Sequence, residues 1–201
     1  MALVVDPAEG TGGRWVPRRG PNTFADAGYC SRSFNQGLLR FHDSATGPVF
    51  RELLFEAFPE LREYDRKADV LAFDWHGCQY LTAKIKGEGE LMVLKADLGI
   101  GQVEPWATAP EFAALLKLDE IGEAFNVGVY DQWREAAGMP EAQLPFTDCV
   151  EFTVPLYLGG AQTLENLQLI DLDVSWTIGA QLRSQTRDLP EGTSVQIDFG
   201  E

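Results

Sequence analysis

The sequence predicts an α+β protein with a mixed or antiparallel sheet, several packed helices and an irregular N-terminal arm. Strand-like segments are concentrated in residues 37–106, whereas helical periodicity dominates residues 108–137 and 171–187. Such segregation of strands and helices along the chain favours an α+β fold over a parallel sheet with alternating helices. The chain has 201 residues, 45% of them apolar, which is enough for a sizeable core without metal ions or disulfides.

Residues 1–32 are expected to form the irregular arm. Glycine and proline residues at 10–13 and 17–21 interrupt any regular element in this part of the chain. We expect residues 33–140 to form one α+β region and residues 141–201 to form a second, C-terminal region, with the two packed as one unit.

The first ordered elements are expected to be a strand at residues 37–42 and a helix at residues 46–57. Thr46 is a candidate N-cap, and Pro48 falls in the first turn, where its missing N–H leaves no helical hydrogen bond unmade. Apolar residues recur at helical spacing through this segment, so the predicted helix has one face for the core.

A β-rich stretch follows the first helix. Its apolar runs predict four strands, at residues 70–75, 78–82, 91–94 and 102–106. His76 and Gly77 separate the first two runs, and this spacing predicts a two-residue hairpin turn.

Helical signals dominate the next part of the chain. Thr108 and Glu111 have the spacing of a capping box, and a further helix is predicted at residues 119–137. The C-terminal third is predicted to contain a strand, a helix and a closing strand, at residues 150–158, 171–187 and 195–199. Pro155 lies within the first of these strands, which predicts an edge position or a bulge.

The chain is strongly acidic, with 31 acidic and 16 basic residues and a net charge of −15. This charge argues against nucleic acid as a partner, because phosphates would be repelled. A negative field attracts basic partners and speeds their association, but many proteins are acidic simply for solubility, and composition alone favours that simpler explanation. The sequence has no apolar run near the roughly 20 residues of a membrane span, no signal-peptide pattern and only three scattered cysteines. We therefore expect a cytoplasmic protein without a membrane partner.

The sequence contains no recognisable catalytic constellation. His76 lies two residues from Cys78, but a turn histidine beside a core cysteine is a simpler interpretation than a nucleophile pair. Asp171 and Asp173 have the spacing of a metal-binding DxD motif, yet acids at a helix start are favoured by the helix dipole. We expect no catalytic residues, no metal ion and no cofactor.

Acidic side chains near aromatic residues are the candidates for binding a basic partner. Charges steer the encounter, while aromatic residues supply much of the binding energy. The candidate partner-binding residues are Asp119, Glu120, Glu123, Glu165, Asp171, Asp173 and Trp176.

Three segments, taken in order along the chain, resemble a known family. They are residues 33–40 (SFNQGLLR), 72–80 (AFDWHGCQY) and 149–160 (CVEFTVPLYLGG), and the last continues into ENL, DLDV and GAQL motifs within residues 165–182. Together they resemble bacterial immunity proteins of type VI secretion systems, which have a GAD-like N-terminal region and a C-terminal immunity domain. The resemblance extends over residues 33–197, and PLYLGG…ENL…DLDV is its most specific part.

The resemblance implies a non-catalytic cytoplasmic protein that binds a cognate toxin, such as a DNase effector, and blocks its active site. A nuclease toxin needs a basic cleft, which an acidic partner can occupy as a phosphate mimic. Two other functions remain open. A small-molecule sensor would need an apolar pocket with a few convergent polar groups, and a hydrolase would need a deep cleft holding a strongly perturbed Asp or Glu.

Overall fold

A computed structural model of the chain describes residues 2–19, 23–119, 121–190 and 193. Within these ranges, seven strands form one antiparallel sheet in which each strand pairs with the next along the chain. They are β1 (Val5–Glu9), β2 (Arg32–Phe34), β3 (Leu39–Phe41), β4 (Asp69–Asp74), β5 (Gln79–Ala83), β6 (Met92–Asp97) and β7 (Gln102–Thr108). The sheet and its accompanying helices confirm the predicted α+β fold class.

A second, two-stranded antiparallel sheet is formed by β8 (Asp148–Phe152) and β9 (Leu167–Asp171). Two short 3-10 helices, η1 (Leu156–Leu158) and η2 (Leu164–Asn166), lie in the connection between these strands. The backbone N–H of Val150 donates to the carbonyl of Trp75 at 2.9 Å, which joins β8 to the β4–β5 turn of the large sheet.

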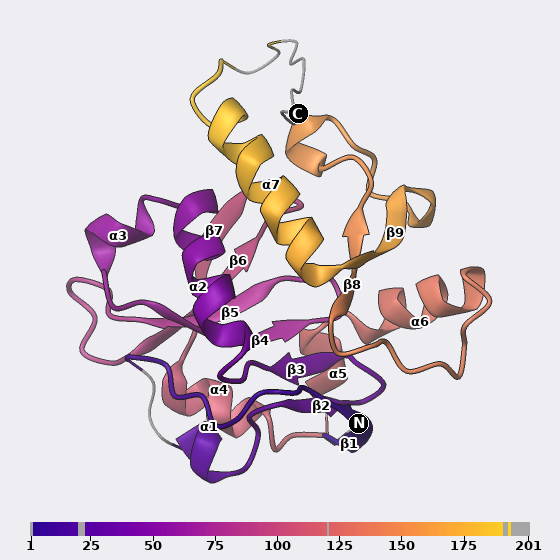
Figure 1. The fold of residues 1–201 in the computed structure, drawn as a ribbon, viewed down its shortest axis with the longest axis horizontal. Coiled ribbons are helices and arrows are strands. Elements are labelled where there is room, and N and C mark those ends of the chain that lie inside the picture. Colours follow the sequence, from indigo (N-terminus) through magenta and orange to yellow (C-terminus); the bar gives the residue numbers. More distant parts are fainter. Residues whose placement is uncertain (1, 20–22, 120, 191–192, 194–201) are drawn as a thin grey trace.

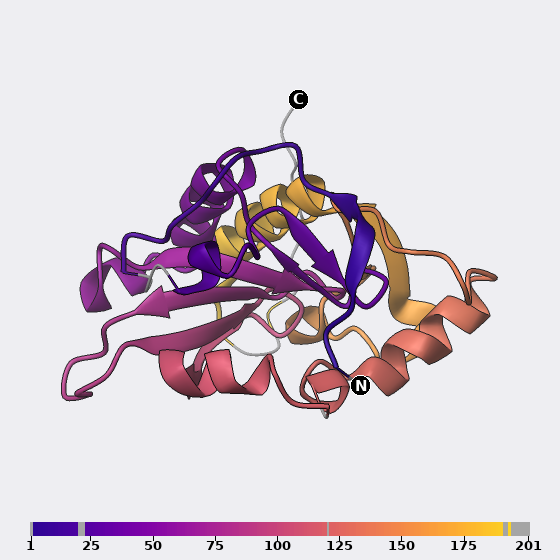
Figure 2. The same cartoon turned by 90° about the horizontal axis from the view of Figure 1, so that it is seen from below.

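Helices cover both faces of the large sheet (Figures 1 and 2). They are α1 (Thr23–Asp26), α2 (Thr46–Ala57), α3 (Leu61–Tyr64), α4 (Ala109–Leu115), α5 (Ile121–Ala124), α6 (Val127–Ala136) and α7 (Leu172–Thr186). In Figure 2, α2 and α7 lie on one side of the sheet, and α4, α5 and α6 lie on the other. No helix in the described part of the chain has both the length and the apolar character to cross a membrane.

Each face of the sheet has its own hydrophobic core. Phe41, Tyr80, Phe112 and Phe125 belong to the core beneath α4, α5 and α6. The core beneath α2 and α7 includes Phe50, Leu54, Phe73, Leu94 and Trp176. Since α7 belongs to the C-terminal region and α2 to the preceding one, residues 33–140 and 141–201 share this second core.

The N-terminal segment differs from the irregular arm that we predicted. Residues 5–9 form β1 at one edge of the large sheet, paired with β2. Asp6 is buried, and its carboxylate accepts hydrogen bonds from the Ser33 hydroxyl at 2.7 Å and from the Gln36 and Gly37 amides at 2.7 and 2.9 Å. This attachment joins residues about thirty positions apart, so local glycine and proline content could not indicate it.

Several predicted helix boundaries are confirmed. The predicted helix at 46–57 coincides with α2, but its N-cap is Ala45 and not Thr46. The Asp43 carboxylate accepts from the amides of Ala45 and Thr46, at 2.9 Å in each case. The capping box of Thr108 and Glu111 is present at the start of α4, with both reciprocal hydrogen bonds.

Other elements differ from the predictions. The helix expected at 119–137 is divided into α5 and α6 by Asn126, which has a left-handed backbone with φ of 53°. The Trp75 indole donates to the Phe125 carbonyl at 2.7 Å, and the Val129 amide bonds to Asn126 instead, so the helix does not continue. The strand expected at 150–158 is shorter than predicted, because β8 ends at Phe152. β9 was not predicted, and the closing strand expected at 195–199 lies outside the described residues.

Candidate binding site

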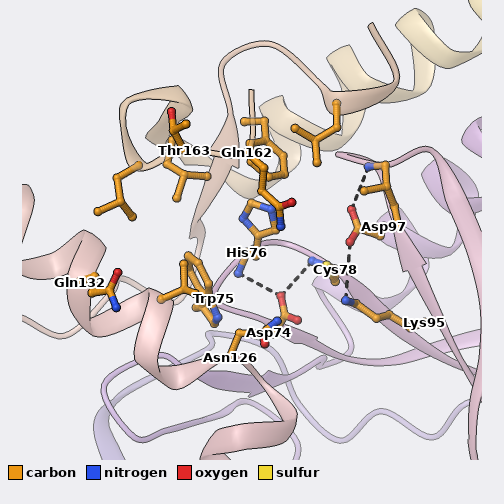
Figure 3. A pocket seen from close by; sticks show the side chains of 16 residues that line it. Asp74, Trp75, His76, Cys78, Lys95, Asp97, Asn126, Gln132, Gln162 and Thr163 are labelled. Atoms are coloured by element: carbon orange, nitrogen blue, oxygen red, sulfur yellow. Dashed lines mark hydrogen bonds and ion pairs between the residues drawn. The ribbon is translucent and has the colours of Figure 1, made fainter. Parts of the chain in front are cut away.

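A groove of about 530 Å³ lies between the β4–β5 turn, α6 and the segment that contains η1 and η2 (Figure 3). Its floor consists of Asp74, His76 and Cys78 from the turn and of Lys95 and Asp97 from β6. Five apolar residues form much of its wall: Ile100, Phe152, Leu156, Leu164 and Leu167. The two lips are exposed side chains, with Asn126 just before α6 and Val129 and Gln132 within it on one side, and Gln162 and Thr163 on the other. The groove therefore combines a charged floor, an apolar wall and an open mouth.

The buried carboxylate of Asp74 determines the shape of the β4–β5 turn. Its Oδ1 accepts from the amides of His76 and Cys78 at 2.9 and 3.1 Å, and its Oδ2 accepts from the Tyr80 hydroxyl at 3.0 Å. All three partners donate, which suits a group that can only accept when ionised. Burial raises the pKa of Asp74 above its ordinary value. Gly77 has a φ of 80°. A hairpin is present as predicted, but its connection is four residues long, 75–78, and not the two-residue turn predicted at His76 and Gly77.

Lys95 and Asp97 form an ion pair on the floor of the groove. The Lys95 ammonium lies 3.6 Å from Asp97 Oδ2, and Asp97 Oδ1 accepts from the Ile100 amide at 3.2 Å. Burial opposes the charged form of Lys95, but Cys78, Asp74 and Asp97 raise its pKa above the ordinary value overall. The floor thus holds two carboxylates against one ammonium.

His76 contributes an imidazole ring to the groove. Its Nδ1 contacts the carbonyl of Val150, and a carbonyl can only accept, so Nδ1 acts as the donor in this contact. The imidazole lies edge-on to Phe152, with ring centroids 4.7 Å apart and planes at 90°. It also packs beside the Trp75 ring at 5.1 Å. These contacts fix the ring within the groove (Figure 3).

Glu151 lies directly before Phe152 and is a pH-sensitive group close to the groove. Its Oε1 accepts from the Phe152 amide at 2.9 Å, and burial raises its pKa to about 7, while His76 acts in the opposite direction. Because the folded-state pKa is higher than in the unfolded chain, Glu151 stabilises the fold when protonated. That contribution is lost as the pH rises from about 4.5 to about 7.

Between pH 5.5 and 8 the protein is expected to lose stability, and we expect Glu151→Gln to remove part of this loss. The amide stays neutral at every pH, so the variant should exceed the wild type by about 1–2 kcal/mol at pH 8 and by less at pH 5.5. Urea unfolding at both pH values measures this difference. Glu104→Gln, at an exposed position on β7, is the control, and equal pH slopes for Glu151→Gln and the wild type would contradict the assignment.

The predicted partner-binding residues are placed in different parts of the fold. Asp171 and Asp173 lie at the start of α7, where the Asp171 carboxylate caps the helix by accepting from the Asp173 and Val174 amides at 2.9 and 3.1 Å. Asp119 and Glu123 are exposed on the opposite side of the large sheet, before and within α5 (Figure 2).

The remaining predicted residues are Glu165, Glu120 and Trp176. Glu165 is exposed in η2, and Glu120 lies outside the described residues. Trp176 is wrong as an exposed binding residue, because its side chain is fully buried and its indole donates to the Gly77 carbonyl at 2.8 Å. Among the described residues of this set, Asp171 and Asp173 lie together at the start of α7.

The alternative interpretation of Asp171 and Asp173 as a metal-binding pair is not favoured by this geometry, because Asp171 acts as a helix cap. In the part of the chain that the structure describes, no group of three or more histidine, cysteine or acidic side chains is arranged to hold a metal ion.

The groove itself was not predicted from the sequence. Its residues come from four separate segments, at 74–78, 95–100, 126–132 and 152–167, and no local pattern relates these segments to one another. Only His76 and Cys78 had been considered, as a possible nucleophile pair. Burial raises the pKa of the Cys78 thiol well above its ordinary value, which disfavours the reactive thiolate.

The net negative charge is concentrated in one part of the chain, because basic residues are scarce there. Residues 118–182 contain eleven acidic residues and one basic residue, Arg134, and so contribute −10 of the net charge of −15. Arg134 is itself paired with Asp131 at 2.7 Å. This segment includes α5, α6, η2, β8 and β9, and it therefore supplies both lips of the groove (Figure 1).

The fold has a counterpart among solved structures. The crystal structure of Atu4351 from Agrobacterium tumefaciens matches with a TM-score of 0.54 and 13% sequence identity, over 87% of this chain and 85% of that chain. At this identity the match shows a shared fold and nothing more specific. No family model and no curated protein matches the sequence.

Proposed function

We propose that this protein is an immunity protein that binds a basic bacterial toxin in the cytoplasm and occludes the toxin's active site without catalysing a reaction. The observation that carries the proposal is the charge of residues 118–182, which hold eleven acidic residues and a single basic one and which supply the lips and part of the wall of an open groove. The type VI immunity resemblance of the PLYLGG…ENL…DLDV stretch falls within the same segment.

The charge distribution supports a basic partner in particular. A toxin that cleaves nucleic acid has a basic active-site cleft, and a surface with ten excess negative charges in 65 residues can compete with phosphate for it. Such a surface also raises the rate of encounter, while buried contacts determine how long the complex lasts. Free thiols at Cys30, Cys78 and Cys149 are compatible with a reducing compartment.

The carboxylates on the groove floor are already engaged by hydrogen bonds and an ion pair, which favours binding over hydrolysis. A general acid or base needs a carboxyl group that is free to exchange a proton with a substrate. Asp74 is instead saturated by three donors, and Asp97 is engaged by Lys95 and the Ile100 amide. These side chains maintain the shape of the turn and the groove.

A small-molecule sensor is the second candidate, and the size of the groove favours it. Pockets for small ligands commonly measure roughly 300–1,000 Å³ and combine apolar walls with a few polar groups. The groove, at about 530 Å³ with a wall of five apolar residues, falls in this range. A thermal-shift screen with metabolites separates the two functions, since only the sensor should be stabilised by a small molecule in the absence of a protein partner.

The test of the immunity function uses the toxin-like product of an adjacent gene. We expect the protein to bind this product, to suppress its activity, and to bind faster at low salt than at high salt. Glu123→Lys combined with Glu135→Lys, both exposed in the acidic segment, should lower the association rate at low salt by about tenfold or more. Stopped-flow or biosensor kinetics at two salt concentrations measure the effect.

The matched control is Glu88→Lys combined with Glu90→Lys, two exposed positions in the β5–β6 loop outside the acidic segment. Both double variants change the net charge by the same amount, so only a local effect distinguishes them. If both double variants slow association equally, the net charge of the protein determines the association rate and the position of the acidic segment does not. Failure of the wild type to bind or inhibit the toxin would exclude the immunity function.

A further inference from the structure

Building on the proposed function, we propose that the groove binds an arginine or lysine side chain of the toxin, with the cationic head at the groove floor and the aliphatic stem against its apolar wall. The charge of residues 118–182 suggests a basic partner without locating the contact. The groove would be the place where one basic side chain of that partner binds.

The floor is suited to a donor-rich cation. Asp74, which already accepts from three donors, and Asp97, which is paired with Lys95, both line the groove, so carboxylates outnumber the single ammonium on its floor. His76 also lines the groove, and since its Nδ1 contacts the Val150 carbonyl, Nε2 is the ring nitrogen left to contact a bound side chain. A guanidinium has donors and no acceptor, and an ammonium likewise only donates, so either matches these acceptors.

The wall is suited to the stem of a long basic side chain. Phe152, Leu156 and Leu164 line the groove above the floor, and each is partly buried in the free protein. Arginine and lysine carry three or four methylene groups that pack on apolar surface while the charged head reaches a polar environment.

The mouth of the groove admits a protein segment. Its lips are exposed residues at the start of α6 and in the connection between η1 and η2. A volume of about 530 Å³ accommodates a long side chain together with part of the loop that carries it. Both lips belong to the acidic segment, so a basic partner attracted to this segment would meet the mouth of the groove.

The experiment blocks the groove without altering charge. Val129 on α6 and Val49 on α2 have nearly equal exposures of 43% and 45%, and only Val129 lines the groove. We expect Val129→Trp to weaken toxin binding at least about tenfold, mainly through faster dissociation, and Val49→Trp to leave it within twofold. Thermal unfolding of both variants verifies that they are folded, and Thr163→Trp on the other lip repeats the test independently.

A second measurement needs no toxin. N-acetyl-arginine amide at millimolar concentration should perturb the groove resonances in a 1H–15N spectrum of the wild type but not of Val129→Trp. N-acetyl-citrulline amide, which has nearly the same shape without the charge, should bind at least about tenfold more weakly. Equal binding of the two compounds overturns the assignment of the groove to a cation.

The outcomes separate the inference from the function on which it depends. If the wild type binds the arginine compound but no toxin, the immunity function fails and the cation site stands. If the toxin binds Val129→Trp and Thr163→Trp as tightly as the wild type, the function stands and the inference is overturned. A metabolite that stabilises the wild type but not Val129→Trp, without competing with the toxin, would also overturn it in favour of a small-molecule site.

Discussion

Arg40→Met is expected to destabilise the protein by about 3–5 kcal/mol, a large fraction of the stability of an ordinary domain. The guanidinium of Arg40 is fully buried and donates to the carbonyls of Pro145 and Asp148 from one side and to the Asp74 carbonyl from the other, at 2.9 Å for Pro145 and 2.8 Å for Asp74. It also lies 4.6 Å above the Phe73 ring. Methionine has a comparable length but no donor, so these carbonyls would lose their partner in a dry environment.

Urea unfolding followed by tryptophan fluorescence measures the effect of this substitution. Arg40→Lys should retain the charge but recover only part of the stability, since one ammonium cannot reproduce the planar arrangement of guanidinium donors. Arg66→Met, at an exposed position, serves as the control for loss of a positive charge. An unfolding midpoint of Arg40→Met equal to that of the wild type would show that the carbonyls find other donors.

Trp176→Ala is the second substitution with a large expected effect, about 3–5 kcal/mol of lost stability. The side chain has no exposed surface, its ring lies 6.4 Å from that of Phe58, and its indole donates to the Gly77 carbonyl at 2.8 Å. Alanine leaves a cavity beneath α7 and an unpaired carbonyl in the turn that forms the groove floor. Trp176→Phe should cost less, because it retains most of the apolar volume.

Equilibrium unfolding again provides the measurement, with Val174→Ala on the exposed side of the same helix as the control. The experiment also decides between a buried and a surface role for Trp176. A surface binding residue would lose partner affinity without losing stability, whereas a core residue loses stability first. A stable Trp176→Ala variant with weakened toxin binding would contradict the buried position.

Elements with local signals were predicted most accurately from the sequence. α2 was recognised with its bounds, since its apolar periodicity and its proline in the first turn are contained within twelve residues. The capping box at Thr108 and the start of α7 after Asp171 were recognised for the same reason. In each case the backbone hydrogen bonds that define the boundary involve side chains two or three residues away.

Features that depend on distant contacts could not be predicted in this way. β1 is fixed by hydrogen bonds between Asp6 and residues 33–37, and the break at Asn126 depends on the Trp75 indole, fifty residues from the carbonyl that it engages. The groove is the extreme case, because four segments contribute to it. The burial of Trp176 could not be predicted either, since aromatic character alone does not distinguish a core residue from a surface one.

The position of α7 has a consequence for synthesis of the protein on the ribosome. The large sheet ends with β7 at Thr108, but the helix that completes the cover over one of its faces ends at Thr186, 78 residues later. At roughly 5–20 residues per second, the nascent chain therefore spends roughly 4–16 s with the apolar face around Phe73 only partly covered. Cells that make this protein are expected to shield that face with chaperones during translation, and messages truncated before α7 should yield aggregated chains instead of a smaller folded unit.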